Sequence, residues 1–141
     1  MIILDTNIIS ELMHELPDAN IRQRISTQKP IHPGITTITI VEIQRGLMHL
    51  PMGKRRIRLT AGFTDFVTEA FSGRIFSFDE EAAYSYGETA AKCETSGFNT
   101  DAVDLMIAAI AKSQHAAIAT RNVKDFSGCG VKIIDPWTQV E

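Results

Sequence analysis

The sequence predicts an α/β fold, in which a short parallel sheet of about five strands is flanked by helices on both faces. Short apolar runs alternate along the chain with longer amphipathic segments, which is the pattern of strands joined by crossover helices. No repeat, low-complexity tract or linker interrupts this alternation. We therefore expect residues 1–141 to form a single domain.

The expected strands are short apolar runs rich in β-branched residues or alanine, bounded by turn-forming or charged residues. The second of them enters from a loop that contains proline and glycine. In chain order the strands are Met1–Leu4, the end of the segment Pro30–Thr37, Arg74–Phe78, Ala116–Ala119 and Val131–Ile134.

The expected helices have apolar residues at helical spacing, with aspartate at several starts and proline or glycine at several ends. Asp79, for example, precedes one of them as an N-cap, and Gly97 ends the same helix. In chain order the helices are Ile8–Glu15, Asp18–Ile25, Thr39–His49, Gly53–Phe71, Glu80–Ser96 and Asp101–Gln114. In the helix Gly53–Phe71, one face is expected to carry the apolar residues Ile57, Phe63, Phe66, Val67 and Ala70.

Length and composition agree with one small globular domain. The chain has 141 residues, of which 44% are hydrophobic and 22% charged, enough to bury a core without disulfides. Its apolar runs are too short to cross a bilayer, and its start, MIILD, lacks the features of a signal peptide. Cys93 and Cys129 form no CxxC motif. We expect a cytoplasmic protein with reduced thiols that does not contact a membrane.

The charge pattern argues against a protein that holds nucleic acid through bulk positive charge, because the net charge is −3 at pH 7. A nuclease stays compatible with this value, since carboxylates that bind cations regain positive charge. One run, GKRRIRL, is locally basic. Two interpretations of it stay open, a solvated helix face or a substrate-binding patch for phosphates. Its basic residues are Lys54, Arg55, Arg56 and Arg58.

Three acidic residues occupy related places around the expected strands. Asp5 comes directly after the first strand, and Glu42 lies in the first turn of the helix after the second strand. Asp104 lies in the first turn of the helix before the fourth strand, which Asn122 and Asp125 follow. Ligands of open parallel sheets bind beyond the carboxyl ends of the strands. The sequence therefore predicts that these side chains meet at one edge of the sheet.

A cluster of carboxylates without nitrogen or sulfur ligands suits hard cations such as Mg²⁺ or Mn²⁺. Two carboxylates ~4 Å apart repel each other by about 4 kcal/mol at an effective dielectric constant of roughly 20, so several together need a cation. Such an ion lowers the pKa of a water molecule and neutralises charge on a phosphodiester. The acids therefore predict a metal site for phosphodiester chemistry.

Each acid also has a purely structural interpretation. Asp5 could be only the N-cap of the following helix. Glu42 could complete a capping box that starts at Thr39, and Asp104 could be a first-turn acid that the helix dipole favours. From the residue pattern alone, the structural and the metal-binding interpretations both stay open.

Three sequence blocks place these acids in a specific context. MIILDTNIISEL has a short strand ending in DTN, TTITIVEIQRG has Glu42 after a threonine-rich strand end, and DLMIAAIAKSQHAAIATRNVKDF has Asp104 at the start of an alanine-rich helix. In order and spacing the blocks resemble PIN-domain endoribonucleases of the VapC/FitB toxin type. FDEEAAYSYGE and the terminal DPW resemble the FitB branch in particular. The resemblance covers nearly the whole chain.

The resemblance implies a PIN fold in which Asp5, Glu42 and Asp104 are the catalytic residues and the ligands of Mg²⁺ or Mn²⁺. It implies a metal-dependent endoribonuclease, a hydrolase that cleaves the phosphodiester bonds of RNA. It also implies the toxin of a type II toxin–antitoxin system, which a cognate antitoxin neutralises. Homodimers and larger assemblies with the antitoxin are usual in this family.

The chain departs from the family pattern at the fourth acidic position. Many members have an acid after TR, where this chain has Asn122, whose amide adds no charge. The number of metal ions, one or two, therefore stays open. Asp125 is the candidate substitute for the missing acid.

Other residues are assigned supporting roles. Asp101 lies near Asp104 and is a candidate to support it, and Thr6 is expected to hold Asp5 through its hydroxyl group. Thr120 and Arg121 are a second candidate contact for RNA.

Two functional interpretations follow from these observations. The first is the metal-dependent RNase, which the intact set of Asp5, Glu42 and Asp104 favours. The second is a non-catalytic PIN scaffold that binds antitoxin or RNA without cleaving it, which Asn122 favours.

Overall fold

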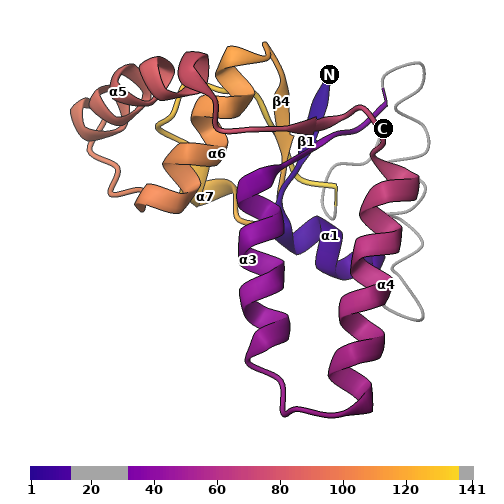
Figure 1. Cartoon of the computed structure of the whole chain (residues 1–141). Helices are drawn as coiled ribbons and strands as arrows, with labels where there is room; N and C mark the ends of the chain where they lie inside the picture. The colour runs from indigo at the N-terminus through magenta and orange to yellow at the C-terminus, as the bar shows by residue number, and fades with distance from the viewer. Residues whose placement is uncertain (14–31, 137–141) are drawn as a thin grey trace.

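The computed structural model describes residues 1–13 and 32–136 (Figure 1). The predicted helix Asp18–Ile25 and the predicted end of the first helix at Glu15 lie outside these residues. The strands are β1 (Ile2–Leu4), β2 (Ile35–Thr36), β3 (Ile75–Phe76), β4 (Ala117–Ala119) and β5 (Ile133–Ile134). The helices are α1 (Thr6–Leu12), α3 (Thr37–Met48), α4 (Lys54–Ala70), α5 (Glu80–Thr95), α6 (Ala102–Ser113) and α7 (Val123–Phe126).

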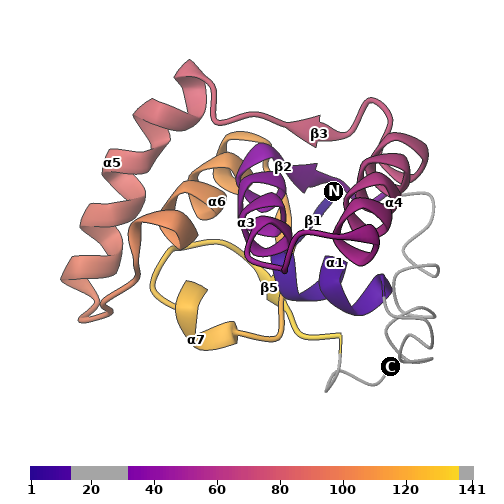
Figure 2. The same ribbon diagram turned by 60° about the horizontal axis from the view of Figure 1, so that its bottom comes forward.

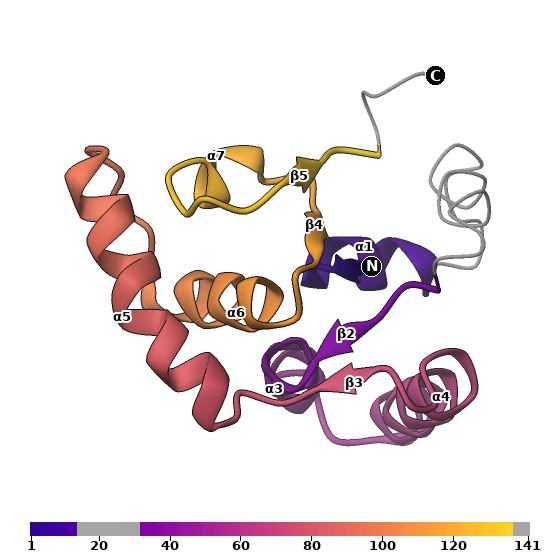
Figure 3. The same cartoon turned by 90° about the horizontal axis from the view of Figure 1, so that it is seen from above.

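The described strands pair in parallel, in a three-stranded part β1-β4-β5 and a two-stranded part β2-β3. The two parts meet where Gly34 bridges Ile3. There the Leu4 N–H donates to the Gly34 carbonyl (2.8 Å), and the Gly34 N–H donates to the Ile2 carbonyl (2.9 Å). The strands therefore stand side by side in the order β3-β2-β1-β4-β5, which Figure 3 shows from above. The predicted fold class is confirmed, although the sheet is divided at this bridge.

Apolar side chains of the strands are buried on both faces of the sheet. Ile3 and Ile118 belong to a cluster with α5 and α6. Ile2 and Leu4 belong to a second cluster with α1 and α4. This alternation has the two-residue period of a strand, and Figure 3 shows the two helical layers on either side of the sheet. The predicted helices on both faces are confirmed.

Helix α4 extends past the sheet at its amino-terminal end. Phe63 and Val67 are buried, with 1% and 7% of their surface exposed, whereas Ile57 is 70% exposed. Ile57 was expected on the same buried face, and that expectation is wrong. Its turn lies at the tip of the α3–α4 hairpin, away from the sheet that covers the other two residues (Figure 1).

The remaining differences concern boundaries and small features. β3 and β5 have two residues each, shorter than expected, and the four-residue helix α7 was not expected. Cys93 and Cys129 are free and buried, with their sulfur atoms 2.9 Å apart. Within the described part of the chain, no helix has the length and apolar character needed to span a membrane.

Candidate active site

The carboxyl ends of β1 and β4 lie side by side where the strand order changes direction. From β1 the sheet continues through β2 to β3 on one side, and through β4 to β5 on the other. The crevice at such a switch point is the usual binding site of parallel α/β sheets. In Figure 2, α1, α3, α6 and α7 gather around the strands in this part of the molecule. The candidate residues come from these elements and from the ends of the two strands.

Asp5 is buried at the end of β1, with 4% of its surface exposed. Its backbone N–H donates to the carbonyl of Ala119 in β4 (2.9 Å). Its Oδ2 atom accepts hydrogen bonds from the Thr120 hydroxyl (2.8 Å) and from Nδ2 of Asn7 (3.2 Å). Asp5 is also the N-cap residue of α1, but its side chain makes no capping hydrogen bond. Capping therefore does not explain the carboxylate.

Thr120 and Asn7 form the support of Asp5. The Thr120 side chain is fully buried and accepts hydrogen bonds from Nδ2 of Asn7 (3.2 Å) and the backbone N–H of Asn122 (3.0 Å). Oδ1 of Asn7 accepts the backbone N–H of Arg121 (3.1 Å). Burial keeps the Thr120 side chain from direct contact with RNA, so its place is that of a positioning residue. Asn7 belongs to the DTN motif, but the sequence did not predict that its amide binds Asp5 on one side and the backbone of Arg121 on the other.

Glu42 lies one turn further into α3 than expected. The helix begins at Thr37, because the Thr36 hydroxyl accepts the Thr39 N–H (3.1 Å) and takes the N-cap position. No acidic residue lies in the first turn, so the expected place of Glu42 in that turn is wrong, and the alternative of a capping box from Thr39 to Glu42 is excluded. Instead Oε1 of Glu42 accepts a hydrogen bond from the Thr6 hydroxyl (2.7 Å). The Thr6 hydroxyl, which was expected to hold Asp5, therefore holds Glu42 instead.

Asp104 is half-buried in the first turn of α6, and its N–H donates to Oδ1 of the N-cap Asp101 (2.9 Å). Burial raises the pKa of Asp104 to about 7, with further repulsion from Asp101, Asp5, Asp125 and Glu42. Burial also raises the pKa of Asp5, to which the charges of Glu42 and Asp125 add. Four carboxylates thus act electrostatically on Asp104, and two of these four also act on Asp5.

Asn122 occupies the position where many family members have a fourth acid, and Asp125 is the candidate substitute. Asn122 is exposed, and its side chain makes no capping bond to α7. Asp125 is exposed in the first turn of α7, and its charge raises the pKa of both Asp5 and Asp104. Asp125 therefore adds negative charge to the site, and Asn122 adds none.

The ligand type of this set fits a hard divalent cation, because its charged donors are carboxylate oxygens. Among the described residues, no group of three acidic, histidine or cysteine side chains is placed closely enough to share a metal ion. The pKa values of Asp5 and Asp104 are nevertheless raised, first by burial and then by the negative charges of neighbouring carboxylates. A shared ion would relieve this repulsion after adjustment of the side chains.

A groove of about 390 Å³ runs between α3 and α6 beside Glu42. Its walls are largely apolar, and Arg45 and His49 add nitrogen atoms from α3. The groove is concave and reaches one of the three principal carboxylates, so it offers a binding surface next to them. Its lining residues are Ile38, Val41, Glu42, Arg45, Gly46, His49, Val103 and Met106.

The basic residues of α4 lie apart from the carboxylates. They occupy the first turns of the helix at the tip of the α3–α4 hairpin (Figure 1). Lys54, Arg55 and Arg58 are exposed, whereas Arg56 is half-buried and donates from Nη2 to the sulfur of Met48 (3.2 Å). Arg121, by contrast, is exposed directly after β4, next to the support of Asp5.

Comparisons with known proteins agree with this architecture. The family model of the PIN domain matches residues 2–128. VapC ribonuclease Y4jK of Sinorhizobium fredii is 37% identical, covering 97% of this chain and 98% of that protein. Toxin FitB of Neisseria gonorrhoeae is 31% identical, covering 97% and 99%. The crystal structure of FitAcB from Neisseria gonorrhoeae matches with a TM-score of 0.89 and 31% identity, covering 99% and 100%. The chain therefore belongs to the PIN-domain family, and within it to the VapC/FitB type.

Proposed function

We propose that this protein is a divalent-metal-dependent endoribonuclease and the toxin of a type II toxin–antitoxin system. The observation that carries the proposal is that neighbouring residues of α1, Thr6 and Asn7, hold the carboxylates of Glu42 and Asp5 at the carboxyl edge of the sheet. The charges of both carboxylates also raise the pKa of Asp104 at the start of α6. Relatives named as a ribonuclease and as a toxin support RNA as the substrate. The three acids are the proposed metal ligands and catalytic residues.

Each proposed ligand is oriented by a different part of the chain. Thr120 and Asn7 orient the carboxylate of Asp5, and Thr6 orients that of Glu42. Asp101 fixes the first turn of α6 that carries Asp104. Mg²⁺ or Mn²⁺ bound by the acids would neutralise charge on the scissile phosphodiester and lower the pKa of a water molecule.

The groove between α3 and α6 is the proposed path of the substrate next to the carboxylates. An unstacked base fits an apolar groove of this size, and Arg45 can contact a neighbouring phosphate. Arg121 is a second candidate contact with RNA. A cognate antitoxin would neutralise the toxin by placing an arginine or lysine against the carboxylates. A homodimer and larger assemblies with the antitoxin are part of the same proposal.

Metal removal tests the proposed function directly. RNA cleavage by the purified protein is expected to stop in EDTA and to return when Mg²⁺ or Mn²⁺ is added in excess. RNA binding, measured in parallel by anisotropy, separates the enzyme from the non-catalytic scaffold. If RNA binds but stays intact at every metal concentration, the scaffold interpretation replaces the enzyme.

Thr6→Val is expected to lower kcat/KM for RNA cleavage by roughly tenfold to a hundredfold. Valine keeps the shape of threonine but removes the hydroxyl that holds Glu42, a hydrogen bond to a charged group worth roughly 1.5–3 kcal/mol. Thr6→Ser keeps this donor and should retain activity within a few fold. Equal loss in both variants would contradict a role for the hydroxyl. Metal titrations of the two variants show whether the loss comes from weaker ion binding.

Replacing Arg55 and Arg58 together with alanine is expected to weaken RNA binding and to leave kcat at saturating RNA nearly unchanged. Both residues are exposed at the start of α4, outside the carboxylate set. The salt dependence of RNA binding should flatten by about two charges. The matched control replaces both with lysine, which keeps the charge and should keep the slope. An unchanged slope in the alanine variant would leave these arginines as a solvated helix face.

A further inference from the structure

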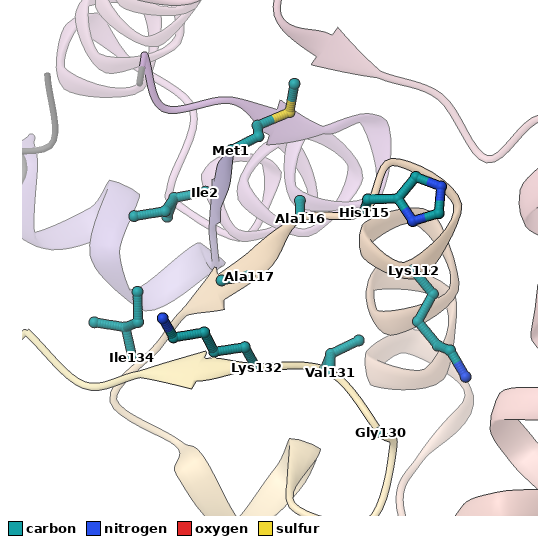
Figure 4. Close-up of a pocket in the computed structure, with 10 residues that line it drawn as sticks. All are labelled: Met1, Ile2, Lys112, His115, Ala116, Ala117, Gly130, Val131, Lys132 and Ile134. Atoms are coloured by element: carbon teal, nitrogen blue, oxygen red, sulfur yellow. The ribbon is translucent and has the colours of Figure 1, made fainter. Parts of the chain in front are cut away.

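A second cavity lies at the amino edge of the sheet, opposite the carboxylates. It has a volume of about 500 Å³ and opens between the starts of β1, β4 and β5 and the end of α6 (Figure 4). Three of its lining residues, Lys112, His115 and Lys132, carry basic side chains, and none of its lining residues is acidic. The other lining residues are Met1, Ile2, Ala116, Ala117, Gly130, Val131 and Ile134.

A further cation reaches the rim of this cavity from α5. Nζ of Lys92 lies 2.8 Å from the position that a Cβ atom of Gly130 would occupy. Gly130 has a φ angle of +75°, which favours glycine, and the absence of a side chain lets the lysine lie over its backbone. Lys112 lines the cavity on the same side, whereas Lys132 lies toward Ile134 (Figure 4).

The lysines at this cavity form no ion pair with an acidic residue of the described part of the chain. Within the described residues, none of Lys92, Lys112 and Lys132 forms an ion pair, although the chain as a whole carries a net charge of −3. Unpaired like charges around a concave surface repel one another and attract an anion. The acids of the candidate active site are at the other edge of the sheet.

His115 occupies a backbone position that normally selects glycine. It follows the end of α6 with a φ angle of +53°. Its N–H donates to the carbonyl of Lys112, and the Ala116 N–H donates to that of Ala111. These are the two hydrogen bonds of a Schellman motif, whose left-handed residue is most often glycine. A histidine there places an imidazole at the cavity, which a glycine could not do.

We propose that this cavity is a nucleotide-binding site that recognises a phosphate monoester and a base. Lys92 and Lys112 contact the phosphate beside Gly130, and the base lies on the apolar floor next to His115. The volume falls in the range of small-ligand pockets, roughly 300–1,000 Å³, and histidine rings stack with bases. The ligand is a free mononucleotide or the phosphate-bearing terminal nucleotide of an RNA strand. This site is separate from the proposed catalytic edge and does not depend on it.

Calorimetric titration of the full chain in EDTA tests the site, because EDTA removes any metal-mediated binding at the carboxylates. Adenosine 5′-monophosphate should bind at least about tenfold more tightly than adenosine or inorganic phosphate, since each of these keeps only one half of the ligand. The Lys92→Gln/Lys112→Gln variant should weaken binding of the nucleotide by about tenfold or more. The control Lys124→Gln removes a lysine outside the cavity and should bind the nucleotide as wild type does.

A short RNA with and without a 5′-phosphate distinguishes the two sources of the ligand. If the site holds an RNA end, the strand with a 5′-phosphate binds more tightly than the strand without it and displaces the mononucleotide. If the site holds free nucleotides, neither strand displaces the mononucleotide. Equal affinity of the nucleotide for wild type and both variants overturns the proposal, as does nucleotide binding no tighter than that of phosphate. RNA cleavage with Mg²⁺ is followed separately, so that failure of the proposed catalytic function leaves this result unaffected.

Discussion

Asp5→Asn is expected to slow RNA cleavage by about a thousandfold or more, because it removes the charge of a proposed metal ligand while leaving its shape. The asparagine can still accept hydrogen bonds from Thr120 and Asn7 through its amide oxygen, so the fold should persist. The loss is measured as kcat at saturating RNA and Mg²⁺. In cells, expression of the wild-type chain without antitoxin should stop growth, and expression of the variant should not.

Asp65→Asn is the matched control for this change, since Asp65 is exposed on α4 away from the carboxylates. It should cleave RNA and stop growth as wild type does. Cleavage by the Asp5→Asn variant within about tenfold of wild type would show that the carboxylate set is not the catalytic site. A thermal unfolding curve close to that of wild type ensures that the comparison concerns chemistry rather than folding.

Asp104→Asn is expected to abolish cleavage and, at the same time, to stabilise the metal-free protein above neutral pH. The pKa of Asp104 rises from 3.8 to about 7 on folding, first through burial and then through its acidic neighbours. The folded state therefore binds more protons than the unfolded state between these values, and the stability of metal-free wild type falls as the pH rises through this window. The variant has no such charge to bury.

The stabilisation should be about 1 kcal/mol at pH 8, a value discounted because the side chain is only half-buried and solvent screens part of the repulsion. This corresponds to an increase in Tm of roughly 3 °C for a chain of this size. Unfolding in EDTA at pH 8 should show the gain, and unfolding near pH 4 should not. A variant that is less stable than wild type at pH 8 would contradict the repulsion described for this site.

The positions of Asp5 and Asp104 could be predicted because local patterns determine them. Asp5 directly follows a run of apolar residues, and Asp104 opens a helix whose apolar spacing is regular. The supports of these acids could not be predicted in the same way. Thr120 holds Asp5 across 115 positions of sequence, and only the pairing of β1 with β4 brings the two together.

Glu42 was expected in the first turn because the helix was predicted to start at Thr39 instead of Thr37, and several neighbouring threonines could have been the N-cap. Thr36, Thr37 and Thr39 are all acceptable N-caps by type. The structure selects Thr36, which ends β2 and has the extended backbone that a cap requires. The bounds of two-residue strands are also hard to predict, because the alternation of buried and exposed residues cannot be recognised over only two positions. Ile57 lies six positions before Phe63, which is about 120° away around the helix, so the spacing itself places Ile57 off the buried face.

The parallel pairing of β1 with β4 also makes the support of Asp5 a contact between distant parts of the sequence. Thr120, which fixes the carboxylate of Asp5, follows it in the chain by 115 positions and is therefore made later. Contacts that span nearly the whole sequence form late, because a long loop must close first. A growing chain that has not yet reached β4 therefore lacks the support of Asp5. We therefore expect the proposed nuclease activity only in chains that include β4 and Thr120.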